Sequence, residues 1–309
     1  MSIEVNQISK IYGRQIAVDD ISFKAEPGNI LGFLGPNGAG KSTTMKILTC
    51  YIPQTSGTAR VCGFDVVENP MEVRRNIGYL PEHNPLYLDM YVKEALNFIA
   101  EIHQVQERPK RIAEVIELTG LGEEQHKKIA ALSKGFRQRV GLAQSIIHDP
   151  RVLILDEPTS GLDPIQIIGI RNLIQELGKT KTVIFSTHIM QEVEAICDRV
   201  IIINKGRIIA DDTLQNLQRS TAGKTIIILE LKEAIDKEIM VEAFGQDLER
   251  LTTVKWKLET AEPEVLKKRI LEFTLQKGIN IVSLQSESPD LEEVFRSLTN
   301  NSPVPLATQ

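Results

Sequence analysis

Apolar and polar residues alternate near the start of the chain as they do in β-strands. Ile3-Glu4-Val5 and Ile21-Ser22-Phe23 alternate, and Glu26-Pro27-Gly28-Asn29 has the composition of a turn. The apolar run from Ile30 to Leu34 predicts a buried strand, and helical spacing follows from Lys41 to Cys50. We therefore expect a buried strand, a glycine-rich loop and a helix in succession.

Helical spacing dominates between residues 87 and 126. It places five apolar side chains on one helix face, namely Val92, Ala95, Leu96, Ile99 and Ile102. Strands then return in alternation with helices, at Leu153 to Leu155, Val183 to Ser186 and Val200 to Ile203. This alternation favours an α/β fold with a mostly parallel sheet. We expect a helical subdomain at about residues 83–145 inserted into that core.

The pattern changes again near residue 221. The β-branched run Thr225 to Leu231, an alternating stretch around Trp256 and a later helical stripe predict a small α/β domain at 221–300. Trp256 is either core or part of a partner interface, since aromatic residues are common in both. We expect residues 1–220 to form the main domain and 301–309 to be a disordered tail.

Composition narrows the classes of protein that are possible. The chain has 309 residues, of which 42% are hydrophobic and 25% charged, as in ordinary globular proteins. The net charge of -5 argues against a nucleic-acid partner, because phosphate contacts require clustered Lys and Arg. Three scattered cysteines fit a reducing cytosol. No apolar run is long enough to span a membrane and no signal peptide is evident, so we expect a soluble chain.

The glycine-rich loop matches a phosphate-binding motif. Residues 35–42 fit G-x-x-x-x-G-K-[ST], between the expected strand and helix. In such loops, backbone N–H groups surround the phosphates and the helix N-terminus adds partial positive charge. Lys41 would reach the β- and γ-phosphates, Ser42 would ligate Mg²⁺, and Thr43 lies close enough to touch a phosphate. The nucleotide-binding loop therefore comprises Gly35, Pro36, Asn37, Gly38, Ala39, Gly40, Lys41, Ser42 and Thr43.

Two adjacent carboxylates follow a second buried strand. Asp156 and Glu157 come directly after Val152-Leu153-Ile154-Leu155, at the carboxyl end of a strand, where ligands bind in open α/β sheets. Asp156 would hold Mg²⁺ through water, and Glu157 would orient or deprotonate the attacking water. The pair could instead cap the following helix or face solvent, but the phosphate loop in the same chain favours ATP hydrolysis.

Residues 1 to about 215 resemble the ATP-binding subunit of an ABC transporter. The stretch Leu132 to Arg139, reading LSKGFRQR, resembles the signature of that family, and Ser160-Gly161-Leu162-Asp163 resembles its D-loop. The resemblance implies that Tyr12 stacks on adenine and that His188 is the switch histidine. It also implies a homodimer that forms on ATP, in which Ser133 and Gly135 contact the γ-phosphate of the nucleotide held by the partner.

Taken singly, several of these residues have simpler explanations. Tyr12 could be a packing residue, and His188 could be a strand-end histidine with its hydrogen bonds satisfied. Ser133 could be a helix N-cap, and it could serve both purposes. Their order along the chain favours the ABC interpretation.

The chain departs from the family pattern in three places. Glu82 replaces the Q-loop glutamine; a carboxylate can still ligate Mg²⁺. In the signature, Lys134 replaces a glycine and Phe136 a glutamine, while Ser133 and Gly135 are kept. This variant resembles exporter ATPases of the antibiotic-resistance, sodium-extrusion and gliding-motility type, and the whole chain is most similar to the gliding-motility branch.

The resemblance implies a function and a location. We expect an ATPase that uses ATP and Mg²⁺, works with polytopic membrane permease subunits and lies on the cytoplasmic face of the cell membrane. One alternative is a soluble ABC-type ATPase that acts on ribosomes or nucleic acid, although the acidic charge speaks against it. Another is a nucleotide kinase, which would leave the signature stretch unexplained.

Overall fold

The chain divides into two compact units, Met1–Leu214 and Gln215–Gln309. The computed structural model describes residues 2–221, 225–245, 248–260, 262–287, 291–292 and 295. The units divide after Leu214, whereas the boundary expected from the sequence comes after residue 220. The tail expected at 301–309 lies outside the described residues. Among the described helices, none combines the length and the apolar character that crossing a bilayer requires.

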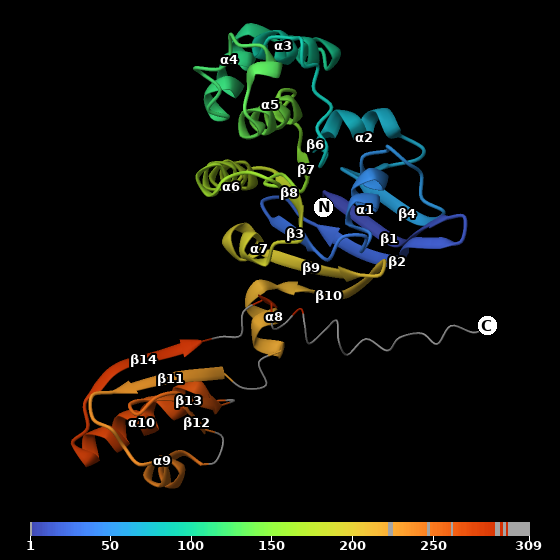
Figure 1. Ribbon diagram of the computed structural model, residues 1–309. Coiled ribbons are helices and arrows are strands. Elements are labelled where there is room, and N and C mark those ends of the chain that lie inside the picture. Colours follow the sequence, from blue (N-terminus) through green and yellow to red (C-terminus); the bar gives the residue numbers. More distant parts are fainter. Residues whose placement is uncertain are drawn as a thin grey trace. The chain divides into compact units, whose positions relative to one another are not determined.

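A six-stranded sheet forms the centre of the first unit (Figure 1). Its strand order is β10-β9-β3-β8-β7-β6, and only β10 runs antiparallel to its neighbour. Every residue of β3, β7 and β8 is buried, as expected for parallel strands covered on both faces. The strands are β3 (Ile30–Leu34), β6 (Ile77–Leu80), β7 (Val152–Asp156), β8 (Thr182–Thr187), β9 (Arg199–Asn204) and β10 (Arg207–Thr213).

An antiparallel sheet of four strands, in the order β2-β1-β4-β5, completes the core. Helix α1 (Lys41–Leu48) contacts β2 and β4 of this sheet and β7 of the parallel sheet, so it lies between the two. Helix α2 (Pro70–Asn76) precedes β6, while α6 (Pro164–Gly178) and α7 (Met190–Ile196) pack together and against β8. The antiparallel strands are β1 (Ile3–Tyr12), β2 (Gln15–Ala25), β4 (Ser56–Val61) and β5 (Phe64–Asp65).

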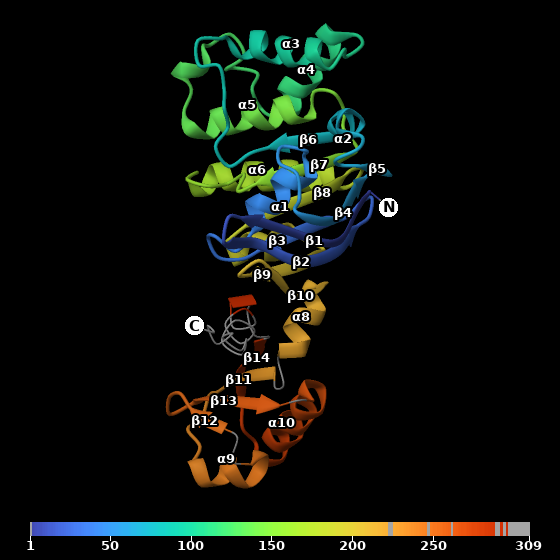
Figure 2. The same cartoon turned by 90° about the vertical axis from the view of Figure 1, so that its right-hand side faces the viewer.

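Three helices pack on one another between β6 and β7 in the sequence (Figure 2). They are α3 (Val92–Ile102), α4 (Arg108–Leu118) and α5 (Lys134–Ile146), and a short 3₁₀ turn (Ile129–Ala131) precedes α5. The predicted apolar face of α3 is only partly correct. Val92, Ala95 and Leu96 are buried, whereas Ile99 is half-buried and Ile102 is 59% exposed. The two isoleucines line a groove, which explains why an apolar stripe extends beyond the core.

The second unit is a separate α/β structure. Its antiparallel sheet has the order β12-β13-β11-β14, and a buried cluster forms its core. Trp256 belongs to that cluster and is fully buried, which confirms the core interpretation over an interface. The elements are α8 (Leu214–Thr221), which begins at the boundary, then β11 (Thr225–Leu231), α9 (Lys237–Phe244), β12 (Leu248–Arg250), β13 (Lys255–Thr260), α10 (Pro263–Lys277) and β14 (Ile281–Glu287).

Candidate functional site

The phosphate-binding loop joins β3 to α1. At two of its positions, close contacts leave no room for any residue larger than glycine. A Cβ atom at Gly35 would lie 2.3 Å from the backbone oxygen of Ile203, in the neighbouring strand β9. Gly40, the N-cap of α1, has a φ of 110°, and a Cβ there would lie 2.6 Å from the backbone oxygen of Ala17. Because neither backbone oxygen can move cheaply, both positions require glycine.

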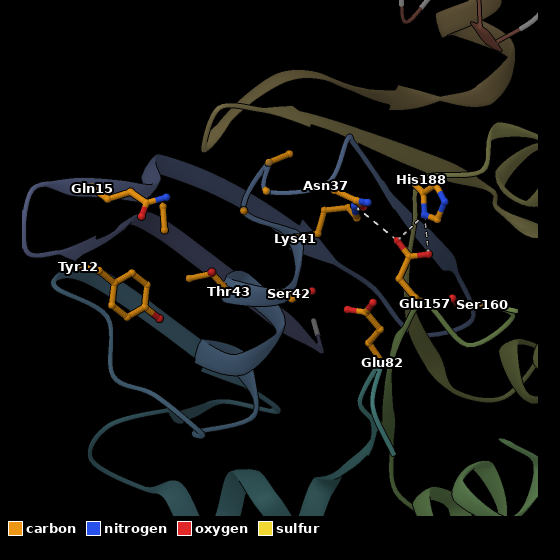
Figure 3. A pocket seen from close by; sticks show the side chains of 14 residues that line it. Tyr12, Gln15, Asn37, Lys41, Ser42, Thr43, Glu82, Glu157, Ser160 and His188 are labelled. Carbon is orange, nitrogen blue, oxygen red and sulfur yellow. Dashed lines mark hydrogen bonds and ion pairs between the residues drawn. The ribbon is translucent and has the colours of Figure 1, made fainter. Parts of the chain in front are cut away.

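A cavity of about 600 Å³ lies against this loop (Figure 3). It brings together most of the predicted site residues, and Gln15, Ala17 and Ser160 line it as well. Tyr12 and Gln15 pair across the turn between β1 and β2. A β-hairpin recognised at this turn could therefore have predicted that Gln15 lies beside Tyr12 in the cavity. The cavity is lined by Tyr12, Gln15, Ala17, Asn37, Gly38, Ala39, Gly40, Lys41, Ser42, Thr43, Glu82, Glu157, Ser160 and His188.

Lys41 and His188 both contact the carboxylate of Glu157 (Figure 3). Lys41 Nζ lies 3.5 Å from Glu157 Oε1, and the side chains of the two residues are only 6% and 7% exposed. His188 Nδ1 lies 3.0 and 2.9 Å from the two carboxylate oxygens. Lys41 also donates to the backbone oxygens of Gly35, at 2.7 Å, and Pro36, at 3.3 Å. A carboxylate, an ammonium group and an imidazole therefore meet at one end of the cavity.

The end of β7 holds Glu157 in place through its neighbour β8. The backbone N–H of Glu157 donates to the backbone oxygen of Ser186 at 3.1 Å and to its hydroxyl at 3.2 Å. Glu157 has a φ of 50°, in the left-handed region that non-glycine residues seldom adopt. Such backbone strain concentrates at functional sites, where the surrounding contacts maintain it.

The three predicted magnesium ligands do not all line the cavity at the phosphate loop. Ser42 and Glu82 line the cavity at the phosphate loop. Asp156 does not line it; this residue is 1% exposed, and its carboxylate accepts a hydrogen bond from the Ser186 hydroxyl. A hydroxyl and two carboxylates are the oxygen donors that Mg²⁺ prefers, so the donor set fits this ion.

The signature residues lie at the start of α5 and do not line the cavity. Ser133 is the N-cap of α5, and its hydroxyl accepts from the backbone N–H of Phe136 at 3.4 Å. Gly135 is buried beside Gln166 of α6, and a Cβ there would lie 2.3 Å from the amide oxygen of that side chain. A single chain thus keeps these residues apart from its own cavity at the phosphate loop.

A second, larger cavity of about 1180 Å³ forms a groove beside α3 and α5. Tyr51, Met71 and Ile102 line it and are exposed. His103 and His148 also line it, and their rings stack with centroids 3.9 Å apart. Glu82 lines both the groove and the phosphate-loop cavity. The two cavities therefore share one wall residue.

The fold and the site define a nucleotide-binding cassette of the phosphate-loop class. The sequence model of the ABC transporter family matches residues 18–160. The chain is 34% identical over 307 residues to a linearmycin resistance ATP-binding protein of Bacillus subtilis (strain 168), covering 97% of this chain and 99% of that protein. It is 38% identical over 219 residues to a bacitracin transport ATP-binding protein of Bacillus licheniformis, covering 70% of this chain and 71% of that protein. The chain therefore belongs to the ATP-binding proteins of the ABC transporter family.

Solved structures agree with this assignment. The structure of an ATP-binding subunit of an ABC transporter superposes with a TM-score of 0.66 at 30% identity, covering 71% of this chain and 93% of the other. A dimeric ATP-binding cassette bound to ADP and phosphate superposes with a TM-score of 0.64 at 23% identity, covering 69% of this chain and 98% of the other. The second comparison supports the fold alone.

Proposed function

We propose that this chain binds ATP·Mg²⁺ and hydrolyses ATP to drive separately encoded membrane subunits of an exporter. The carboxylate of Glu157, held between Lys41 and His188 at the phosphate loop, is the observation that carries the proposal. In this proposal Glu157 orients and deprotonates the attacking water, and His188 senses the γ-phosphate. Names of relatives favour a resistance or transport system, and the gliding-motility type stays a prediction.

The remaining site residues would hold the nucleotide and its metal. Tyr12 stacks on the adenine, the loop from Gly35 to Thr43 surrounds the phosphates, and Lys41 neutralises their charge. Ser42, Glu82 and Asp156 hold Mg²⁺, which supplies positive charge to the β- and γ-phosphate oxygens when it is bound. Asp156, whose carboxylate also accepts a hydrogen bond from the Ser186 hydroxyl, would hold the metal through water.

ATP would bring two chains together. Ser133 and Gly135 lie outside the cavity of their own chain, which supports a role toward the nucleotide of a second copy. The N-terminus of α5 and the charge of Lys134 both favour contact with an anion at that position. In this proposal, hydrolysis then separates the two chains and moves the membrane subunits bound to them.

The groove beside α3 is where we place the membrane partner. Its exposed Tyr51, Met71 and Ile102 form an apolar surface that suits a short amphipathic segment. Because Glu82 also lines the nucleotide cavity, binding of ATP can alter the groove directly. In this proposal the protein is a peripheral subunit on the cytoplasmic face of the cell membrane.

The test is capture of the Glu157→Gln chain with ATP from native membranes, followed by mass spectrometry. A polytopic membrane protein in fixed stoichiometry is expected. Ile102→Asp should abolish its recovery while ATP binding is unchanged, whereas Leu118→Asp, a control at an exposed leucine outside the groove, should retain it. Recovery of ribosomal proteins or DNA-bound factors instead would favour the soluble ABC-type ATPase.

A further inference from the structure

A buried carboxylate lies outside the lining of the cavity at the phosphate loop. Glu192 belongs to the first turn of α7 and is 0% exposed. Its Oε1 accepts a hydrogen bond from the Thr159 hydroxyl at 2.5 Å, and its Oε2 accepts one from the Thr187 hydroxyl at 2.7 Å. The residue does not line the nucleotide cavity. Its contact with the site therefore runs through the two threonines and the segments to which they belong.

The two threonines lie next to the residues proposed for catalysis. Thr159 follows Glu157 by two positions, and Thr187 immediately precedes His188. Since His188 Nδ1 is hydrogen-bonded to the Glu157 carboxylate, the contacts close a ring. The ring runs from Glu157 along the chain to Thr159, across Glu192 to Thr187, and through His188 back to Glu157.

We propose that Glu192 is a positioning residue for ATP hydrolysis, which keeps His188 on the carboxylate of Glu157. This inference rests on the proposed function. A hydrogen bond to a charged group is about twice as strong as one between neutral groups, so the carboxylate is a stronger link than an amide or hydroxyl.

The geometry also explains why one residue can act on two loops. The segment after β7 and the end of β8 each contribute one threonine, and Glu192 gives each of them a separate oxygen. The backbone N–H of Ile189 donates to the Thr187 hydroxyl at 3.0 Å, which orients the O–H group toward Glu192. Loss of the carboxylate would free both segments, and a displacement of about 1 Å at a reacting group can cost about 100-fold in rate.

The experiment compares the turnover of full-length variants with their thermal stability. Glu192→Ala should lower kcat about 10- to 100-fold, as loss of supporting contacts does at other sites, with the Kd for ATP unchanged. Glu192→Gln, which keeps the shape, should give an intermediate kcat and guards against a failure of the alanine variant to fold. Thr274→Val, which removes a buried hydroxyl elsewhere, should leave kcat unchanged.

A triple variant separates positioning from simple support of the core. Thr159→Val, Thr187→Val and Glu192→Met together replace the polar cluster by apolar groups of similar shape, which is nearly neutral for stability. The Tm should recover relative to Glu192→Ala while kcat stays low. Recovery of kcat together with Tm, or wild-type kcat in folded Glu192→Gln, would overturn the proposal. Retained turnover in Glu157→Gln would instead remove Glu157 from the role of base in the proposed function, and absence of ATP turnover in the wild-type chain would refute that function itself.

Discussion

Replacing Glu157 by glutamine tests the centre of the site on two counts, namely stability without nucleotide and turnover. The Lys41 side chain is 6% exposed, and the substitution removes the only carboxylate that the described structure records within 4 Å of its ammonium group. Removing one partner of a buried ion pair costs about 3–5 kcal/mol. Lys41 keeps its two backbone acceptors, so we expect a loss nearer about 1–3 kcal/mol, as for an unsatisfied buried group.

That loss is measurable as a change in melting temperature. For a unit of this size, about 1 kcal/mol corresponds to a shift of about 2–4 °C. The nucleotide-free variant should therefore melt several degrees below the wild type. With ATP present the phosphates restore a negative partner for Lys41, so the stabilisation by ATP should be larger in the variant. Turnover should fall about 10²- to 10⁴-fold, the usual contribution of a general base.

The assay is thermal unfolding with and without ATP·Mg²⁺, together with phosphate release under saturating ATP. Glu176→Gln is the matched control, because Glu176 forms an exposed ion pair with Lys179 and such pairs contribute at most about 1 kcal/mol. An unchanged Tm combined with an unchanged stabilisation by ATP would refute the inference that the buried ion pair of Lys41 and Glu157 stabilises the fold. Unchanged turnover would remove Glu157 from the role of base.

Three further outcomes are expected. Ser133→Trp should weaken ATP-driven dimerisation in sedimentation experiments while nucleotide binding by the monomer is unchanged; loss of monomer binding would contradict the role in trans. Glu82→Gln should raise the affinity for ATP in EDTA, because the carboxylate repels the γ-phosphate when Mg²⁺ is absent, and should lower it in excess Mg²⁺; equal changes in both conditions would refute this. Burial lowers the pKa of His148 to about 4, so the unfolded chain takes up the proton first and stability falls between pH 6.5 and about 4. The loss is at most about 3 kcal/mol, and urea unfolding of His148→Phe should show a smaller loss over that range.

Local features of the site could be predicted from the sequence because they depend on residues that are adjacent in the chain. The spacing of Gly35, Gly40 and Lys41 specifies a strand, a turn and a helix start, and the structure has these elements. The carboxylates Asp156 and Glu157 follow an apolar run that could only be a buried strand or a buried helix segment, and its short length favoured the strand. The resemblance to the ABC family covers the same motifs, and the comparisons confirm the family.

Contacts between distant segments depend on the order and register of the strands, which hydrophobic periodicity does not encode. β7 lies between β6 and β8, with Asp156 opposite Ser186, and this register places the Ser186 hydroxyl on Asp156 and its backbone oxygen on the Glu157 N–H. The pairing of β6 with β7 brings Glu82 to the wall shared by the two cavities. The buried carboxylate of Glu192 gave no signal of its own, because an acidic residue early in a helix usually faces solvent. Only the packing of α7 against β8 places it between two threonines, since burial and hydrogen-bond partners are properties of the assembled fold.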